Sequence, residues 1–438
     1  MELYIGFAGI LVMTLLIAIG VPIAIALSSV AIIGLLILMG PSVTIAHLSM
    51  LPFREMSSYV LASAPLFILM GDFISHSDFG RDLFDSVKKW VGSVKGGLAM
   101  STVIGGTILG ASCGSILAAT AVLGRVALPE MERQGYSQEL SSGSISAAGT
   151  IAGVIPPSMM LILYGLLTHQ SIGALFIAGI MPGVMSAVIY CIGIYVMTSS
   201  KTFSGRIRMV APPAEKYPMK EKIASTAQIL PFVLLIILVI GGIYGKLFTP
   251  TEAGAAGAFG ALMLVVLYRR FTLRIFKDSL ISSASTSSYI FIMVVAALLF
   301  GRFITHSGIP SAIAGWVVSL PFPPTMILVG ILICFFIFGM FIEPLGLLFI
   351  IVPIIYPVVQ ILGYNPIWFG ILVMKAVEIG CVTPPLGVNC YVMKGVAKQV
   401  PMSKIFYGSA FFVILDIIAL AFLIAFPQIT LYLVQFFY

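Results

Sequence analysis

The chain has 438 residues, of which 60% are hydrophobic and only 9% are charged, and its mean hydropathy is +1.14. A soluble domain carries about 25% charged residues and buries only about 70–75% of the surface of its unfolded chain. The composition therefore excludes an ordinary soluble enzyme, a disordered protein and a nucleic-acid-binding protein. It predicts an all-α polytopic membrane protein.

The net charge of +7 comes from basic residues that cluster between apolar segments. Most lysines and arginines lie in four clusters, near residues 81–133, 201–222, 269–277 and 394–404. Such clusters mark the cytoplasmic ends of membrane segments rather than a nucleic-acid surface. The distribution of the basic residues therefore indicates how the chain is oriented in the membrane.

The apolar segments predict spanning helices in chain order, since a span needs about 20 apolar residues. Residues 3–39 are interrupted at Gly20 and Pro22, which predicts two spanning helices joined by a tight turn. Further spans are predicted near 58–77, 171–198, 225–246, 251–268, 281–304 and 405–427. The segments 44–56 and 80–95 are too polar to span, and 80–95 has the pattern of a helix lying at the membrane surface.

Four other apolar regions are broken in the middle. Residues 97–128 and 323–362 are interrupted by small, polar or proline residues, and residues 139–169 and 366–397 each contain a Pro-Pro pair. All basic clusters face the cytoplasm only if 97–128 enters and leaves the membrane on the same side. We therefore predict two re-entrant hairpins that open to opposite sides, with both chain termini outside. The alternative is that each hairpin region forms two short full spans of about 14 apolar residues.

The two halves of the chain repeat the same order of elements. The division falls near 200–224, the only long polar segment, and each half contains spans, a hairpin, a broken helix and a final span. The spacing from Gly110 to Pro156 nearly equals that from Gly339 to Pro384. The halves start on opposite sides, which predicts an inverted repeat, the pattern of secondary transporters with broken helices near the bilayer midplane.

A break in a helix at membrane depth frees backbone N–H and C=O groups, and these groups must find partners within the protein or its ligands, because lipid offers none. Freed carbonyls can coordinate a hard cation such as Na⁺, and helix N-termini attract an anion. The paired breaks therefore predict two equivalent cation sites with a substrate site between them. The alternative for each single Gly or Ser is that it serves only close helix packing.

Four motifs resemble the large membrane subunit of tripartite ATP-independent periplasmic (TRAP) transporters, the dicarboxylate-type permease. They are GASCGSILAAT (110–120), GTIAGVIPPS (149–158), TPTEAG (249–254) and EIGCVTPPLGVN (378–389). The resemblance implies an elevator-type, Na⁺-coupled permease in the bacterial inner membrane, with both termini periplasmic. It also implies two partners, a small four-helix membrane subunit and a periplasmic substrate-binding protein. The implied substrate is an organic anion such as a dicarboxylate, sialic acid or a sugar acid, with Na⁺ as coupling ion and no organic cofactor.

The resemblance also implies the residues of both sodium sites, mostly through backbone carbonyls. The first site would use Gly110, Ser115, Ala152, Ile155 and Pro157, and the second Gly339, Gly380, Thr383 and Leu386. No carboxylate is obliged to enter either site.

Substrate contacts are expected from polar residues near the breaks, namely Ser112, Thr150, Ser158 and Asn389. For each of them, a hydrogen bond to its own helix backbone is an equal alternative. Glu343, Lys375 and Glu378 are candidates for an electrostatic or gating role, because ionisable residues inside a membrane are costly and usually functional. Lys375 and Glu378 are three residues apart on one helix, so a purely structural ion pair is the alternative.

These readings divide the chain into a scaffold and a transport domain. The scaffold would comprise 1–96 with its interfacial arm, 171–322 with a cytoplasmic loop at 199–224, and the last span in 399–438; the transport domain would comprise 97–170 and 323–398. The competing functions are a stand-alone Na⁺/carboxylate carrier or ion antiporter of the same superfamily, and an intramembrane enzyme. The enzyme is disfavoured because no HExxH motif, paired intramembrane aspartates or GxSxG motif with a partner His is found.

Overall fold

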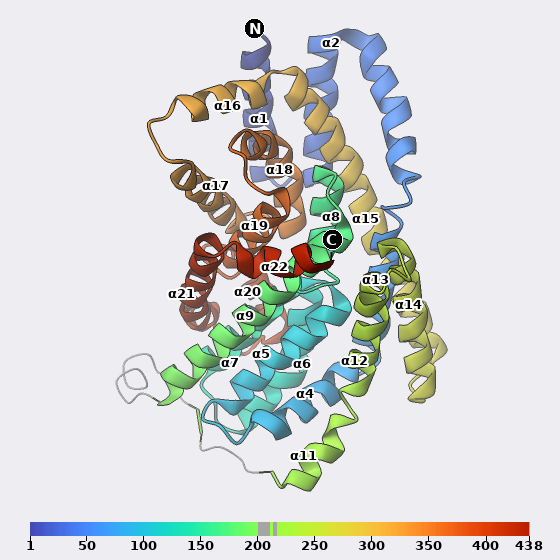
Figure 1. The fold of residues 1–438 in the computed structure, drawn as a ribbon, viewed down its shortest axis with the longest axis vertical. Coiled ribbons are helices and arrows are strands. Elements are labelled where there is room, and N and C mark those ends of the chain that lie inside the picture. The colour runs from blue at the N-terminus through green and yellow to red at the C-terminus, as the bar shows by residue number, and fades with distance from the viewer. Residues whose placement is uncertain (200–210, 213–216, 438) are drawn as a thin grey trace.

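A computed structural model describes residues 1–199, 211–212 and 217–437, and the regular structure in these ranges is entirely helical (Figure 1). Most of the predicted loop 199–224 lies outside the described residues. Six helices are long and apolar enough to cross a membrane, or up to seven if one bent pair counts as a single span. The chain is therefore a multi-pass membrane protein.

The first apolar stretch forms two helices that meet near Gly20, as predicted. They are α1 (Glu2–Ala18) and α2 (Ile23–Met56). The second helix does not end at Met39 but kinks at Gly40 and continues through 44–56, so that it turns back beside itself (Figure 1). Gly40 adopts φ +77°, which glycine tolerates without steric cost, and Pro41 suits the first turn of the segment that follows.

The amphipathic segment forms helix α4 (Phe79–Val91), after the short helix α3 (Ser63–His76). Most of its apolar side chains, including Phe79 and Phe84, are buried, whereas Trp90 is exposed. Arg270, between α14 (Pro250–Leu267) and α15 (Leu273–His306), donates to the Ser77 carbonyl at 2.8 Å, pairs with Asp82 and lies over the Phe79 ring. These contacts tie the start of α4 to the α14–α15 loop.

Both predicted hairpin regions are two helices joined by a short break. The first is α5 (Gly97–Cys113) and α6 (Ile116–Arg133), and the second is α17 (Pro324–Gly339) and α18 (Pro344–Ile361). Gly114 takes φ +61° at the first break, and Ser115 caps α6 by accepting the N–H of Ala118. Small residues at the tip therefore let the chain reverse between two buried helices.

Both Pro-Pro regions are also broken as predicted. The first consists of α7 (Gln138–Thr150), the 3₁₀ turn η1 (Ile151–Gly153) and α8 (Met159–Thr168). The second consists of α19 (Pro366–Cys381) and α20 (Val388–Val396). In both, the Pro-Pro peptide bond is cis and lies in the non-helical segment, where proline prevents the helix from resuming.

The remaining helices complete the two halves of the chain. They are α9 (Ile172–Ser199), α11 (Met219–Thr226), α12 (Leu230–Ile236), the π-helix η2 (Ile237–Gly241), α13 (Gly242–Tyr244), α16 (Ile309–Ser319), α21 (Met402–Ala425) and α22 (Gln428–Phe437). Neither α16 nor α22 was predicted as a separate helix. Like α4, α16 precedes a hairpin.

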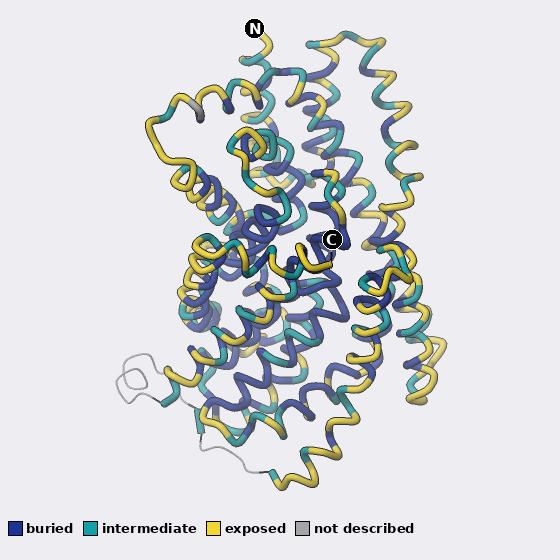
Figure 2. Tube along the Cα trace, in the orientation of Figure 1, coloured by how far each residue is buried: buried dark blue, intermediate teal, exposed yellow. Residues whose placement is uncertain are grey.

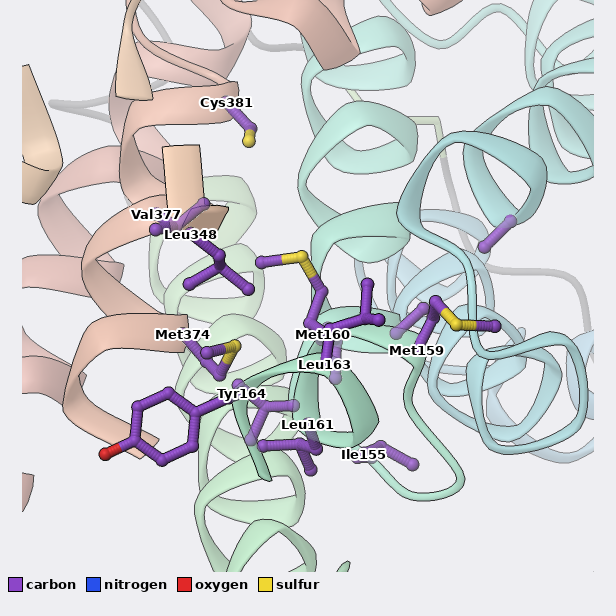
Figure 3. Packing of buried hydrophobic residues seen from close by; sticks show 14 of the residues in the cluster. Ile155, Met159, Met160, Leu161, Leu163, Tyr164, Leu348, Met374, Val377 and Cys381 are labelled. Carbon is purple, nitrogen blue, oxygen red and sulfur yellow. The ribbon is translucent and has the colours of Figure 1, made fainter. Parts of the chain in front are cut away.

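The buried residues concentrate on the first hairpin, on α18 and on the broken helices, whereas α1, α2, α14, α16 and α17 carry many exposed residues (Figure 2). Around α8, Met160, Leu163 and Tyr164 pack towards Leu348 of α18 and Met374 of α19 (Figure 3). The Tyr164 hydroxyl donates to the Pro366 carbonyl at 2.7 Å, which links α8 to the start of α19. The broken elements of the two halves thus share one core.

Candidate functional site

The tip of the first hairpin lies directly against the first broken helix. The backbone N–H of Met159 donates to the carbonyl of Gly114 at 3.2 Å. A Cβ at Gly110 would lie 2.8 Å from the Cα of Ala152, and one at Gly114 would lie 2.6 Å from the Pro157 carbonyl oxygen. The structure therefore brings together four of the five residues expected at the first cation site, because Ser115 follows Gly114 directly.

The second half repeats this contact. The N–H of Gly387 donates to the carbonyl of Met340 at 3.2 Å, again joining a hairpin break to a helix break. A Cβ at Gly380 would lie 2.6 Å from the carbonyl carbon of Gly339. The Thr383 hydroxyl donates to the Ile379 carbonyl at 2.6 Å. The residues expected at the second cation site are thus close in space as well.

The carbonyl oxygens at both breaks have free acceptor capacity. In the described ranges, six of the expected ligand carbonyls accept no backbone hydrogen bond: those of Ala152, Ile155, Pro157, Gly339, Thr383 and Leu386. The side chain of Ile155 contacts Gly183 of α9, and the side chain of Leu386 lines an apolar hollow beside α1, α17 and α18. Only the backbone of these two residues is therefore suited to bind a cation, and oxygen is the ligand that hard cations prefer.

No carboxylate cluster competes with these breaks as a metal site. Across the described residues, no group of three or more His, Cys, Asp and Glu side chains is placed to hold a metal ion. Backbone carbonyls at the two breaks stay the predicted cation ligands.

A cavity of about 200 Å³ lies between the two hairpin tips. One wall is formed by the breaks of both hairpins and the start of α8, and the opposite wall by α3 and α15. Its polar lining residues are Asp72 and Ser75 of α3, Ser282 and Thr286 of α15, Ser115 of the first tip and Glu343 of the second. The cavity thus lies between the shared core of broken helices and the flanking long helices.

The cavity combines helix N-termini with two carboxylates. Helix α6 begins at its wall, so the N–H groups of Ile116 and Leu117 lack partners within the helix. Glu343 accepts a hydrogen bond from the Tyr289 hydroxyl at 3.0 Å. One oxygen of Asp72, Oδ2, is buried without a hydrogen-bond partner in the described part of the chain. A bound molecule could therefore meet both backbone donors and carboxylates in this cavity.

The α3 and α15 wall was not anticipated from the sequence. Asp72 could have been found, since it is a lone carboxylate in the predicted span 58–77 and such residues are usually functional. Ser75, Ser282 and Thr286 carry no comparable signal, because serine and threonine are common in membrane helices. Only the packing of α15 beside α3 places them at the cavity.

The four expected substrate contacts lie in the protein interior and do not line this cavity. The hydroxyls of Ser112 and Thr150 donate to carbonyls of their own helices, and that of Ser158 donates to the Gly153 carbonyl at 2.6 Å. The Asn389 amide donates to the Ser146 carbonyl at 2.5 Å. In this arrangement their polar groups stabilise the breaks, and direct substrate contact stays a prediction.

Lys375 and Glu378 form the expected ion pair, at 2.9 Å, but they are not alone. Lys375 also pairs with Asp416 of α21 at 2.5 Å, and Asp416 accepts the Tyr190 hydroxyl at 2.5 Å. All four side chains are at most 1% exposed. The pair is therefore part of a buried cluster that joins α9, α19 and α21.

A second hollow of about 630 Å³, the vestibule, adjoins the cavity at Ser75. Charged residues of α4 and α6 line it, including Arg81, Asp85, Arg125, Glu130 and Arg133. Glu130 accepts hydrogen bonds from Arg133 at 2.9 and 2.7 Å, and these bonds, with the paired Lys88, lower the pKa of Glu130 to about 2. Burial raises the pKa of Asp85. The vestibule opens among the residues of a predicted cytoplasmic basic cluster.

Comparisons with known proteins identify the family. The chain is 34% identical over 345 residues to the C4-dicarboxylate TRAP transporter large permease protein DctM of Pseudomonas aeruginosa, covering 78% of this chain and 79% of the relative. It is 33% identical over 425 residues to the ectoine TRAP transporter large permease protein TeaC of Halomonas elongata, covering 95% and 96%. The sialic acid TRAP transporter large permease protein SiaM of Vibrio cholerae is 29% identical over 419 residues, with 95% and 96% covered.

Two solved structures share the fold at low sequence identity. The YdaH transporter of Alcanivorax borkumensis has a TM-score of 0.60 at 11% identity over 89% of this chain and 90% of that one. MtrF of Neisseria gonorrhoeae has a TM-score of 0.60 at 13% identity over 89% and 85%. The family model described as "Tripartite ATP-independent periplasmic transporter, DctM component" matches residues 10–429. The chain is thus a transporter permease and not an enzyme, and it belongs to the DctM family of large permease components of TRAP transporters.

Proposed function

We propose that this protein imports an organic acid across the bacterial inner membrane through the cavity between its hairpin tips. The observation that carries this proposal is the composition of the cavity wall, which combines both hairpin breaks, the start of α8 and the helices α3 and α15. The names of the relatives place C4-dicarboxylates, sialic acid and ectoine among the substrate classes to test. Backbone donors at the start of α6 suit a carboxylate group.

Sodium is the proposed coupling ion. Each hairpin break is hydrogen-bonded to a helix break, and the carbonyls at both breaks are free to accept a cation. Na⁺ bound there would hold each tip against its broken helix through neutral oxygens. Such sites suit an ion that must be released at each cycle, because they bind it without a permanent opposite charge.

The proposed motion is that of an elevator. The hairpins and broken helices form one packed unit, the transport domain, while α3, α15 and their neighbours form the scaffold. The two parts contact closely at Gly71, where a Cβ would lie 2.7 Å from the Cα of Cys113. In this proposal the vestibule beside the cavity opens to the cytoplasm, so the structure corresponds to an inward-facing conformation. A transporter built from an inverted repeat alternates between such a conformation and an outward-facing one.

The permease is proposed to work with two partners, a small membrane subunit and a periplasmic substrate-binding protein, and to have both termini on the periplasmic side. The alternative is a carrier of the same superfamily that works alone. The tripartite permease and the stand-alone carrier differ in the protein components that transport requires.

Reconstitution into proteoliposomes tests them. We expect uptake of a radiolabelled C4-dicarboxylate, sialic acid or ectoine to require this chain, its small subunit, the cognate binding protein and an inward Na⁺ gradient. Replacing Na⁺ with K⁺ at equal ionic strength is the control. Equal uptake by this chain alone would overturn the tripartite reading, and equal uptake in K⁺ would remove sodium coupling.

A further inference from the structure

The buried cluster of Lys375, Glu378, Asp416 and Tyr190, here called the charge cluster, has no role in the function proposed so far. It contains one basic and two acidic side chains, each at most 1% exposed. When all three are ionised, the cluster carries one excess negative charge. An uncompensated charge in a membrane protein interior is costly and needs a partner.

The two carboxylates share the one lysine. Asp416 Oδ1 forms an ion pair with Lys375 at 2.5 Å, and Asp416 Oδ2 accepts the Tyr190 hydroxyl at 2.5 Å. Glu378 uses only Oε2, which accepts from Lys375 at 2.9 Å. In the described residues, Asp416 Oδ1 and Glu378 Oε1 are both buried without a hydrogen-bond partner. The excess negative charge is therefore shared between Glu378 and Asp416.

The free oxygen of Glu378 lies beside the first helix break. A Cβ at Gly153 would be 3.2 Å from Oε1, so the carboxylate contacts the backbone of η1 next to Ala152. The same Cβ would also crowd the Cδ1 atom of Ile116 at 2.9 Å. The Thr150 hydroxyl, one residue before η1, also interacts with Tyr190 of the charge cluster. The cluster is thus packed behind the first proposed cation site.

Glu378 also lies near the second break along its own helix. It precedes Gly380 by two residues on α19, and Gly380 packs against Gly339 of the second hairpin. One carboxylate therefore lies between the two breaks, although it belongs to the second half and contacts the first. The other charged or titratable side chains that interact with it are Lys375, Asp416, Tyr190 and Cys381.

From this placement we propose that Glu378 is the shared counter-charge of the two cation sites, a positioning residue that raises Na⁺ affinity through the electrostatic field without coordinating the ion. The inference rests on the proposed sodium coupling. It explains how sites built only from neutral carbonyls attract a cation in a dry interior, where a single charge acts strongly over several ångströms. It also gives Oε1 a reason to have no donor, since a donor there would weaken that field.

The test is a sodium titration that does not depend on transport. The full-length chain in detergent is heated in rising NaCl, with KCl keeping the ionic strength constant, and the unfolding midpoint is followed by intrinsic fluorescence. Binding to the folded state raises the midpoint in proportion to the logarithm of ligand concentration over Kd. We expect a Na⁺-specific rise in the wild type, and Glu378→Gln to need on the order of tenfold more Na⁺ for the same rise.

Two further variants separate charge from packing. Glu378→Asp keeps the charge and should retain most of the Na⁺ affinity, whereas Glu221→Gln removes a charge from the exposed helix α11 and should titrate like the wild type. Gln at 378 can still accept the hydrogen bond from Lys375, so the fold should be kept. An unfolding midpoint of the wild type that does not change with Na⁺ concentration would contradict sodium coupling itself. A wild-type rise with an unchanged Glu378→Gln titration would overturn only the role of Glu378.

Discussion

Gly380 of α19 lies so close to Gly339 at the end of α17 that a Cβ on Gly380 would be 2.6 Å from the Gly339 carbonyl carbon. Both glycines belong to helix ends that stop at a break. The atoms that such a Cβ would meet belong to the backbone, so no side chain can rotate away to make room. A shift of either helix at this contact would also move the hairpin tip.

Gly380→Ala should therefore destabilise the protein by about 1–3 kcal/mol, the usual cost of an overpacked core, and should abolish Na⁺-dependent uptake. Gly330→Ala is the matched control, since it lies on α17 with open space around it. At this position the added methyl group should stabilise the folded protein by about 0.4–1 kcal/mol, because alanine lowers the conformational entropy of the unfolded chain. The measurement is the unfolding midpoint in detergent together with uptake; equal behaviour of the two variants would contradict the tight contact.

Asp72 places a carboxylate in the wall of the proposed substrate cavity, and no Lys, Arg or His lines that cavity among the described residues. Asp72→Asn should therefore lower the KM for an anionic substrate, on the order of tenfold for one charge at short range. A substrate that carries a cationic group as well should instead lose affinity. Asp278→Asn, exposed at the start of α15, is the control. Unchanged KM values for both substrate types would place the substrate elsewhere.

Glu130, which lines the vestibule, should make the stability of the folded protein depend on pH. Its pKa is lowered to about 2 from an ordinary 4.5, mainly by the hydrogen bonds from Arg133. A lowered carboxyl pKa stabilises the folded state above the unfolded pKa, and this stabilisation is lost as the pH falls towards the folded pKa. The unfolding midpoint of the wild type should exceed that of Glu130→Gln at pH 7, and the difference should shrink between pH 4.5 and pH 2. A constant difference over this interval would show that the ion pair contributes nothing.

Cys113 at the first hairpin tip lines the cavity and reports the proposed elevator motion. In a variant whose other four cysteines are replaced, a membrane-impermeant maleimide should label it from the cytoplasmic side in the inward-facing arrangement. Labelling from the periplasmic side should appear once the transport domain has crossed. The two sides are compared in right-side-out and inside-out vesicles, with Cys113→Ser as the unlabelled control. Labelling from one side only, under every Na⁺ and substrate condition, would contradict the motion.

Much of the fold could be read from local pattern. The breaks at Gly114 and Ser115, and those at the two Pro-Pro pairs, fall inside the predicted hairpin and broken-helix regions because glycine and proline act on their own backbone. The continuation of α2 past Gly40 was missed, since a polar stretch can remain helical when a glycine kink turns it back along the molecule. Helices α16 and α22 were missed because short helices depend on packing for their stability.

The sequence by itself determined the membrane class, the family, the order of broken elements and the positions of the glycines and prolines at the breaks. The membrane class and the breaks follow from composition and from the conformational limits of single residues, and the family follows from the resemblance of four motifs. Only the tertiary structure decided which side chains share a space: Asp72 and Glu343 in the lining of one cavity, Asp416 beside the pair of Lys375 and Glu378, and the free oxygen of Glu378 beside Gly153. Each of these arrangements joins residues from different helices, and their distance and charge balance exist only once the helices have packed.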